Sequence, residues 1–183
     1  TLKFDNQDNL SEIHIPKRLF AHQMIEEAMI LANICAAKYI KKHIGYGIYR
    51  VHEEPEVLKI ENLKKFFSLK GLSSKSFLKT IELINGFIKH VNKDEGNKMM
   101  NILILQTLKR AQYSTKEIGH FGLQLKEYSH FTSPIRRYPD LVAHRLIKEI
   151  LHKEIQKPNQ ERLEEELAEL SSLEKRAEKS SRQ

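Results

Sequence analysis

Two adjacent arginines, Arg136 and Arg137, follow a Thr-Ser-Pro tripeptide and precede an apolar run with helical spacing. Thr132 or Ser133 can serve as a helix N-cap, and Pro134 suits the first helical position because its missing N–H costs nothing there. The sequence therefore predicts both guanidinium groups in the first turn of a helix. Since a helix N-terminus already carries partial positive charge, two cations there indicate a bound anion, typically a phosphate.

The same spacing allows a second interpretation, in which the arginines simply pair with a carboxylate. Arg136 lies four residues before Asp140, and Arg137 lies three residues before it. Both separations bring side chains together on one face of a helix. The spacing alone does not choose between an anion site and an ion pair, and Pro139 requires either a kink or a short first turn.

A second set of polar residues lies around a long apolar stretch at residues 28–37. Glu26 and Glu27 stand at its entrance, where they either pair on entering a core or remain on a solvated first turn. Asn33 interrupts the stretch itself. Because buried polar groups are normally hydrogen-bonded, we expect Asn33 to bond a loop backbone or to line a site.

Metal ligation has little support in this sequence. The nine histidines include no His-Glu-x-x-His motif and no Cys/His set with zinc spacing, and the aspartates are scattered along the chain. We therefore expect no metal ligands among these residues. His120, His130 and His144 are expected to pack in the interior or to bond the backbone.

The composition narrows the class of partner. The formal net charge is +7 and the sequence pI is about 9.4, which favours a polyanion such as nucleic acid. The single cysteine, Cys35, lies in an apolar run and is expected to be a small buried hydrophobic residue in a reducing, cytoplasmic setting. No stretch approaches the ~18 apolar residues of a membrane span, so we expect no membrane partner.

Hydrophobic periodicity predicts an α+β fold that is predominantly helical, with a few short antiparallel strands. The central part of the first long helix is apolar on nearly every side, which predicts burial in a large core. Strand pieces near 112–114 and 128–131 are expected to pair. The predicted strands are 2–4, 12–15, 48–52, 112–114 and 128–131, and the predicted helices are 18–43, 55–70, 75–85, 97–113, 134–152 and a last one from 158.

Four blocks of sequence occur in an order and spacing that resemble a known family. They are residues 25–33 (IEEAMILAN), 48–53 (IYRVHE), 119–123 (GHFGL) and 130–145 (HFTSPIRRYPDLVAHR). Together they resemble the catalytic RNB domain of the ribonuclease II and ribonuclease R family over nearly the whole chain. The Arg-Arg-Tyr-Pro-Asp version of the last block is more similar to the ribonuclease R branch.

The resemblance implies a magnesium-dependent 3′→5′ exoribonuclease that hydrolyses single-stranded RNA processively to 5′-nucleoside monophosphates. It implies that Arg136 is the catalytic residue at the scissile phosphate and that Glu26 contacts the terminal ribose. A guanidinium there would stabilise developing charge, and a carboxylate that accepts from a 2′-OH would distinguish RNA from DNA. The expected RNA-binding residues are Glu26, Asn33, Ser133, Arg137 and Tyr138.

The resemblance also implies that residues 1–183 form the C-terminal portion of such a catalytic domain. The family's upstream half, which binds Mg²⁺ through aspartates, and its flanking OB-type domains are expected outside this stretch, so we expect no RNA hydrolysis by these residues alone. Besides single-stranded RNA, the expected partners are RNA-decay or ribosome-associated proteins. The alternative is a non-catalytic, basic helical module that binds RNA or protein.

Overall fold

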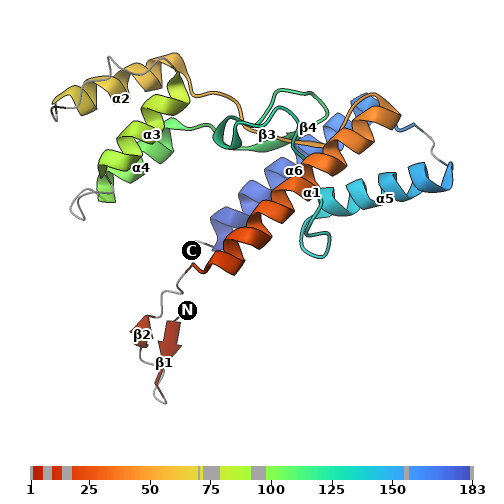
Figure 1. The fold of residues 1–183 in the computed structure, drawn as a ribbon, viewed down its shortest axis with the longest axis horizontal. Helices are drawn as coiled ribbons and strands as arrows, with labels where there is room; N and C mark the ends of the chain where they lie inside the picture. Colours follow the sequence, from red (N-terminus) through yellow and green to blue (C-terminus); the bar gives the residue numbers. More distant parts are fainter. Residues whose placement is uncertain are drawn as a thin grey trace. The chain divides into compact units, whose positions relative to one another are not determined.

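The computed structural model of the chain describes residues 2–5, 10–13, 18–69, 71, 79–91, 98–154 and 157–181. The chain divides into two compact units, Thr1–Ala32 and Asn33–Gln183, and each is described by itself. Figure 1 follows the elements in chain order, from β1 to α6. None of the helices described is both long enough and apolar enough to cross a membrane.

The first unit contains a short antiparallel hairpin and the beginning of a long helix. Leu2 of the first strand lies opposite Ile13 of the second. The elements are β1 (Leu2–Phe4), β2 (Leu10–Ile13) and α1 (Phe20–Ile44), which continues into the second unit. All three were predicted, although β2 begins earlier than expected and residues 14–15 lie outside the described part.

The second unit is mostly helical, with one further pair of strands. Its elements are β3 (Tyr49–Val51), α2 (Val57–Leu69), α3 (Thr80–Val91), α4 (Lys98–Thr107), β4 (Gln112–Ser114), the 3₁₀ helix η2 (Phe121–Leu123), α5 (Tyr138–His152) and α6 (Gln160–Ser181). The predicted fold class, predominantly helical α+β with short antiparallel strands, is confirmed.

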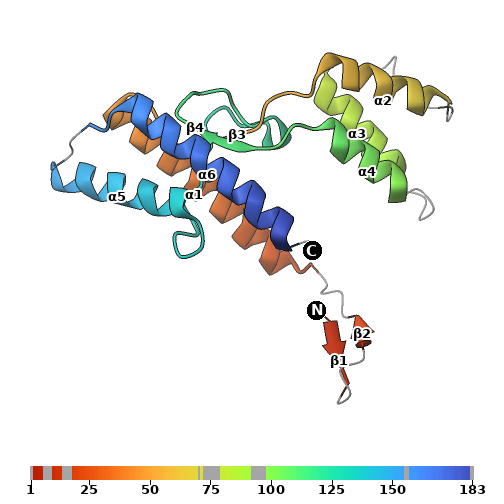
Figure 2. The same cartoon turned by 180° about the vertical axis from the view of Figure 1, so that it is seen from behind.

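One hydrophobic cluster joins the C-terminal part of α1 to α5 and α6. Ile40 and Ile44 of α1 pack in the same cluster as Leu163 and Leu167 of α6 and as Leu146 of α5. Figure 2 shows α6 running alongside this part of α1. Phe131, in the loop that precedes α5, packs against this cluster.

A second cluster lies among α2, α3 and α4. Phe67 of α2 and Phe87 of α3 are almost fully buried, and their rings stack with centroids 4.0 Å apart. Phe121 of η2 belongs to the same cluster, which connects these helices to the turn around His120. Helix α4 is shorter than the predicted helix at 97–113 because the chain leaves it to form β4.

The strand pairing differs from the prediction. β4 pairs antiparallel with β3, with Tyr49 opposite Ser114, and not with the segment 128–131. That segment instead lies against β3, where the backbone N–H of Arg50 donates to the carbonyl of Tyr128 at 2.8 Å. The turn signals in this region predicted local pairing, whereas the pairing observed is between segments far apart in sequence.

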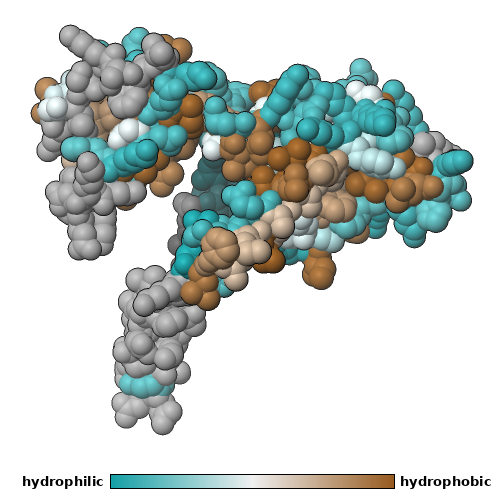
Figure 3. Space-filling view, in the orientation of Figure 1, coloured by the Kyte–Doolittle hydropathy of each residue, from teal (hydrophilic) through white to brown (hydrophobic). Residues whose placement is uncertain are grey.

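The prediction that the middle of α1 is buried on all sides is wrong for the described residues. The buried positions are Asn33, Ala36, Ala37, Ile40 and Ile44, which is the spacing of one helical face. Leu31 is 62% exposed and Cys35 is also exposed, so the expected burial of the cysteine is wrong as well. Figure 3 shows hydrophobic side chains reaching the surface over the helices.

Candidate functional site

The loop that leads to the two arginines is anchored on α1 by Asn33. The side chain of Asn33 is 3% exposed; its Nδ2 donates to the hydroxyl of Tyr128 at 3.1 Å. Its Oδ1 accepts the backbone N–H of Phe131 at 2.9 Å. The expectation that Asn33 bonds a loop backbone is therefore confirmed, while a direct contact with RNA stays a prediction.

Helix α5 binds the backbone carbonyl of Phe131, whose N–H is bound by α1. The Nε2 of His144 lies 2.9 Å from the backbone carbonyl of Phe131, and the two rings stack with centroids 4.0 Å apart. Because a carbonyl can only accept, this contact places a proton on Nε2 of His144. Both backbone polar groups of Phe131 are thus fixed, one by α1 and one by α5.

His130, the residue before Phe131, is held in its neutral form. Its Nδ1 lies 2.9 Å from the hydroxyl of Tyr113 on β4. Burial, together with the positive charges of Arg137 and Arg50, lowers the pKa of His130 to about 3. Burial also raises the pKa of Tyr113 to about 12, so neither ring carries charge at neutral pH.

His120 completes the set of histidines singled out from the sequence. Its Nδ1 accepts the backbone N–H of Leu123 at 3.2 Å, and burial followed by the neighbouring His52 lowers its pKa to about 4. The expectation that His120, His130 and His144 pack or bond the backbone is confirmed.

The two arginines lie before the helix and not in its first turn. The backbone N–H of Arg137 donates to the carbonyl of Ser133 at 3.1 Å, which closes a turn, and α5 begins only at Tyr138. Neither Thr132 nor Ser133 is the N-cap: Arg137 occupies that position, without a side-chain cap bond. Pro139 consequently falls in the first helical turn, where its missing N–H is not needed.

A buried carboxylate explains this displacement. Asp140 is fully buried, and its Oδ1 accepts both the backbone N–H of Ser133 and a guanidinium N–H of Arg137, each at 2.8 Å. The ion pair between Arg137 and Asp140 is thus present. An acidic side chain in the first turn of a helix is also favoured by the helix dipole.

Arg136 has a different environment from its neighbour. It is exposed, and within the described residues it forms neither an ion pair nor a side-chain hydrogen bond. Tyr138, on its other side, is 50% exposed. The ion-pair interpretation therefore holds for Arg137, and Arg136 remains the candidate for binding an anion.

Buried polar atoms without a hydrogen-bond partner gather in this loop. Over the described part of the chain there are four such side-chain atoms: Thr132 Oγ1, Arg137 Nε, Asp140 Oδ2 and His52 Nε2. Three of them belong to the segment 132–140. Since buried polar groups are normally paired, their concentration marks this segment as a candidate functional site.

Glu26 belongs to the first unit and lies on the exposed surface of α1. Its carboxylate forms an ion pair with Arg18, and the two side chains are 49% and 65% exposed, respectively. Glu26 is therefore solvent-exposed and paired, but it does not lie in the first turn of the helix, because α1 begins at Phe20. Its role toward a ribose stays a prediction.

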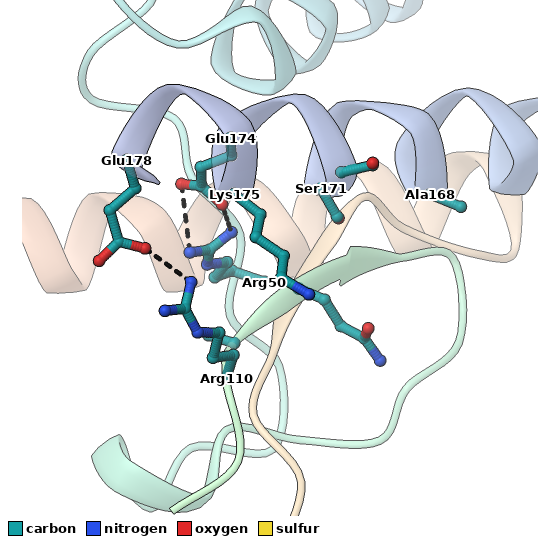
Figure 4. A pocket seen from close by; sticks show the side chains of 10 residues that line it. Arg50, Arg110, Ala168, Ser171, Glu174, Lys175 and Glu178 are labelled. Atoms are coloured by element: carbon teal, nitrogen blue, oxygen red, sulfur yellow. Dashed lines mark hydrogen bonds and ion pairs between the residues drawn. The ribbon is translucent and has the colours of Figure 1, made fainter. Parts of the chain in front are cut away.

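Sequence reasoning missed the residues that support the loop from the β3–β4 side. The guanidinium of Arg50 lies 4.5 Å from the centre of the Tyr113 ring and forms two hydrogen bonds, at 2.6 and 3.2 Å, with Glu174 of α6. Figure 4 shows this pair beside a second one, between Arg110 and Glu178. These four side chains line a pocket of about 530 Å³. The only sequence signal was that Arg50 lies within the block at 48–53.

Known proteins similar to this chain include a family model and curated relatives that match most of its length. The family model described as RNB domain matches residues 1–153. Ribonuclease R of Vibrio parahaemolyticus is 38% identical over 152 residues, which cover 82% of this chain and 18% of the relative. The chain therefore spans about a fifth of the length of such curated relatives.

Solved structures with this fold include both nucleases and a pseudonuclease. The apo form of Mycoplasma genitalium RNase R superposes with a TM-score of 0.75 at 28% identity, covering 93% of this chain and 27% of that one. The same enzyme in complex with ribose methylated single-stranded RNA gives 0.72 at 30% identity, with the same coverage. Yeast Ssd1, described as a pseudonuclease, gives 0.66 at 26% identity, covering 86% of this chain and 20% of that one.

Proposed function

The chain belongs to the RNB domain family, and we propose that it is part of a ribonuclease R-type 3′→5′ exoribonuclease. The whole protein would hydrolyse single-stranded RNA processively to 5′-nucleoside monophosphates in the cytoplasm, with RNA-decay or ribosome-associated proteins as partners. Support comes from relatives named ribonuclease R and from an RNase R of similar structure in complex with RNA. The net charge of +7 suits a polyanionic substrate.

The observation that carries the proposal is the free, exposed guanidinium of Arg136 on a loop fixed at several points. Hydrolysis of a phosphodiester develops negative charge on the phosphoryl oxygens, and a guanidinium can donate two parallel N–H bonds to such oxygens. Asn33 and His144 fix Phe131, and Asp140 fixes the turn that carries Arg136. A donor held in this way needs little reorganisation when the charge develops.

The neighbouring side chains have roles that follow from their chemistry. The half-exposed ring of Tyr138 offers a surface on which a base can stack, and the hydroxyl of Ser133 can donate to a phosphate oxygen. Glu26, on the exposed surface of α1, would accept a hydrogen bond from a ribose 2′-OH. Asn33 would act by holding the loop.

Magnesium enters the proposal only through residues outside this chain. Over the described residues, no group of three His, Cys, Asp or Glu side chains is arranged to hold a metal ion. The described residues therefore do not fit the ion, and no step assigned to Arg136 depends on it. We accordingly propose that residues 1–183 do not hydrolyse RNA by themselves.

The test uses Arg136→Ala in the full-length protein that contains this chain. We expect the single-turnover rate on labelled single-stranded RNA to fall by about a hundredfold or more, with little change in the Kd for RNA. The control is Arg145→Ala, which removes the same charge from an exposed position on α5. An unchanged single-turnover rate for Arg136→Ala would refute the assignment.

The alternative is a non-catalytic module that binds RNA, and the similarity to a pseudonuclease supports keeping it. The same protein distinguishes the two functions. Release of 5′-nucleoside monophosphates from single-stranded RNA supports the enzyme. Salt-dependent RNA binding without any release, with magnesium present, supports the binding module.

A further inference from the structure

Arg136 and Arg137 are adjacent in sequence but lie in opposite environments. The side chain of Arg137 is 18% exposed and is paired with Asp140, whose side chain is 0% exposed. Arg136 is exposed and, among the residues described, has no acidic partner. The fold thus places two chemically identical side chains in different environments, one partly buried and paired, the other exposed and without an acidic partner among the described residues.

The buried carboxylate of Asp140 requires a counter-charge. An ionised carboxylate removed from water is stable only when it is paired and hydrogen-bonded. The cation that meets this need is Arg137, whose guanidinium donates to Oδ1 at 2.8 Å. The same oxygen also accepts the backbone N–H of Ser133 at 2.8 Å.

These two bonds fix both ends of the turn that carries Arg136. Ser133 is its first residue, and Arg137 is its last, as the bond from the N–H of Arg137 to the carbonyl of Ser133 shows. Asp140 therefore holds the segment from which Arg136 projects, and in the described structure it forms neither a hydrogen bond nor an ion pair with the Arg136 side chain. This arrangement is what is expected of a residue that positions another.

The unpaired atoms of the ion pair point to the same role. A side-on pairing between arginine and a carboxylate joins Nε and one terminal nitrogen to the two carboxylate oxygens. One of these bonds is formed here, and the two atoms needed for the other, Nε of Arg137 and Oδ2 of Asp140, are both buried without a partner. Each side chain thus keeps the buried polar atom with which the other could form the second bond of a side-on pair, which supports Asp140 as the partner of Arg137.

We propose that Asp140 is a positioning residue for Arg136 and that Arg137 is its structural counter-ion, so that Arg136 alone of the two arginines contacts the phosphate of RNA. This inference rests on the proposed function and revises the expectation that Arg137 binds RNA. In this proposal the Arg137–Asp140 pair fixes the position of Arg136 and does not contribute to the affinity for RNA. A misplaced catalytic group can lose about a hundredfold in rate without losing its substrate.

A double-mutant cycle in the full-length protein tests the role of Asp140. Asp140→Asn keeps the size of the side chain and an acceptor for the N–H of Ser133 but removes the charge that holds Arg137. We expect it to lower the single-turnover rate by about a hundredfold with an unchanged Kd for single-stranded RNA. In the Arg136→Ala background the same substitution should have no further effect, because the group it positions is gone.

Equal losses in both backgrounds would overturn the proposal, because they would show that Asp140 acts independently of Arg136. An unchanged rate for Asp140→Asn alone would overturn it as well. If the wild-type protein releases no nucleotides, or if Arg136→Ala is as fast as wild type, the proposed function fails and this inference with it. If the wild-type protein is active and Arg136→Ala is slow, but the effects of Arg136→Ala and Asp140→Asn are additive, the proposed function stands and only this inference fails.

The role of Arg137 is tested with a neutral pair. Arg137→Gln leaves the carboxylate of Asp140 buried without its counter-charge, so this variant should unfold at a lower temperature than wild type. Adding Asp140→Asn should restore most of the Tm, and the double variant should match Asp140→Asn in rate. If the double variant is tenfold or more slower than Asp140→Asn, Arg137 contacts the substrate. A tenfold difference in rate corresponds to ~1.4 kcal/mol.

Discussion

The Oδ1 of Asn33 accepts a hydrogen bond from the backbone N–H of Phe131, 98 residues further along the chain, at 2.9 Å. This bond connects the buried face of α1 to the loop that carries Arg136. Because the Nδ2 of the same amide donates to Tyr128, one side chain fixes two points of the loop. The precision of the candidate site therefore depends on a residue that is itself only 3% exposed.

Replacing Asn33 should cost stability. Asn33→Ala leaves the N–H of Phe131 without its acceptor, and a buried unsatisfied donor costs about 1–3 kcal/mol. We expect a decrease of this size in the free energy of unfolding, measured by urea denaturation. Cys35→Ala is the matched control, because Cys35 is exposed on the same helix and its replacement should change stability by less than about 0.5 kcal/mol. Similar values for the two variants would contradict this account.

The aromatic stack between α2 and α3 should dominate the stability of the second cluster. Phe67 is 0% exposed, and its ring lies parallel to that of Phe87 within 8°. Phe67→Ala should lower the free energy of unfolding by about 3–5 kcal/mol, because it removes the contacts of a buried ring and leaves a cavity. Leu69→Ala, on the same helix but 86% exposed, should change it by less than about 0.5 kcal/mol. The free energies of unfolding of both variants are measured by chemical denaturation and compared with that of wild type.

How far the sequence predicts the site depends on how local each interaction is. The pairing of Arg137 with Asp140 spans three residues, and spacing alone included it among the two possibilities. The neutral, packed histidines and the loop contact of Asn33 also followed from simple rules about buried polar groups. Spacing did not distinguish Arg136 from Arg137; the choice of Arg136 came from the resemblance to the RNB family, and its role at a phosphate stays a prediction.

Interactions that the local sequence rules do not include account for the errors. Local capping rules placed the start of α5 at Pro134, but the carboxylate of Asp140 takes the N–H of Ser133 and draws the residues before Tyr138 into a turn. β4 pairs with β3, more than 60 residues away by register, and not with the nearer segment 128–131. The burial of α1 depends on which of its faces other elements cover, and the periodicity of its own sequence does not predict this.

Protonation of His130 should make the protein less stable in acid. Its pKa is about 3 in the folded state and 6.5 in the reference state, so below pH 6.5 the unfolded chain binds a proton that the folded chain does not. Stability is therefore full above about pH 6.5 and is lost as the pH falls toward 3. The dependence contributed by one such group is at most about 1.4 kcal/mol per pH unit.

The measurement is the free energy of unfolding between about pH 6.5 and pH 4, for wild type and for His130→Gln. The substituted side chain can still bond the hydroxyl of Tyr113 but does not titrate, so the slope against pH should decrease. His152→Gln, at an exposed position in the last turn of α5, is the control. A slope that His130→Gln leaves unchanged would mean that His130 does not take up the proton.

The Arg50–Glu174 pair should be worth more than a surface ion pair of similar chemistry. The side chain of Arg50 is only 14% exposed, makes two hydrogen bonds with Glu174 and lies over the ring of Tyr113. Screening by water is reduced for a partly buried pair, so a double-mutant cycle should give a coupling energy of about 1 kcal/mol or more. The pair between Arg162 and Glu166, with side chains 81% and 50% exposed, should give about 0.3–0.5 kcal/mol in the same experiment. Equal coupling energies would mean that α6 is held against β3 by its hydrophobic contacts and not by this pair.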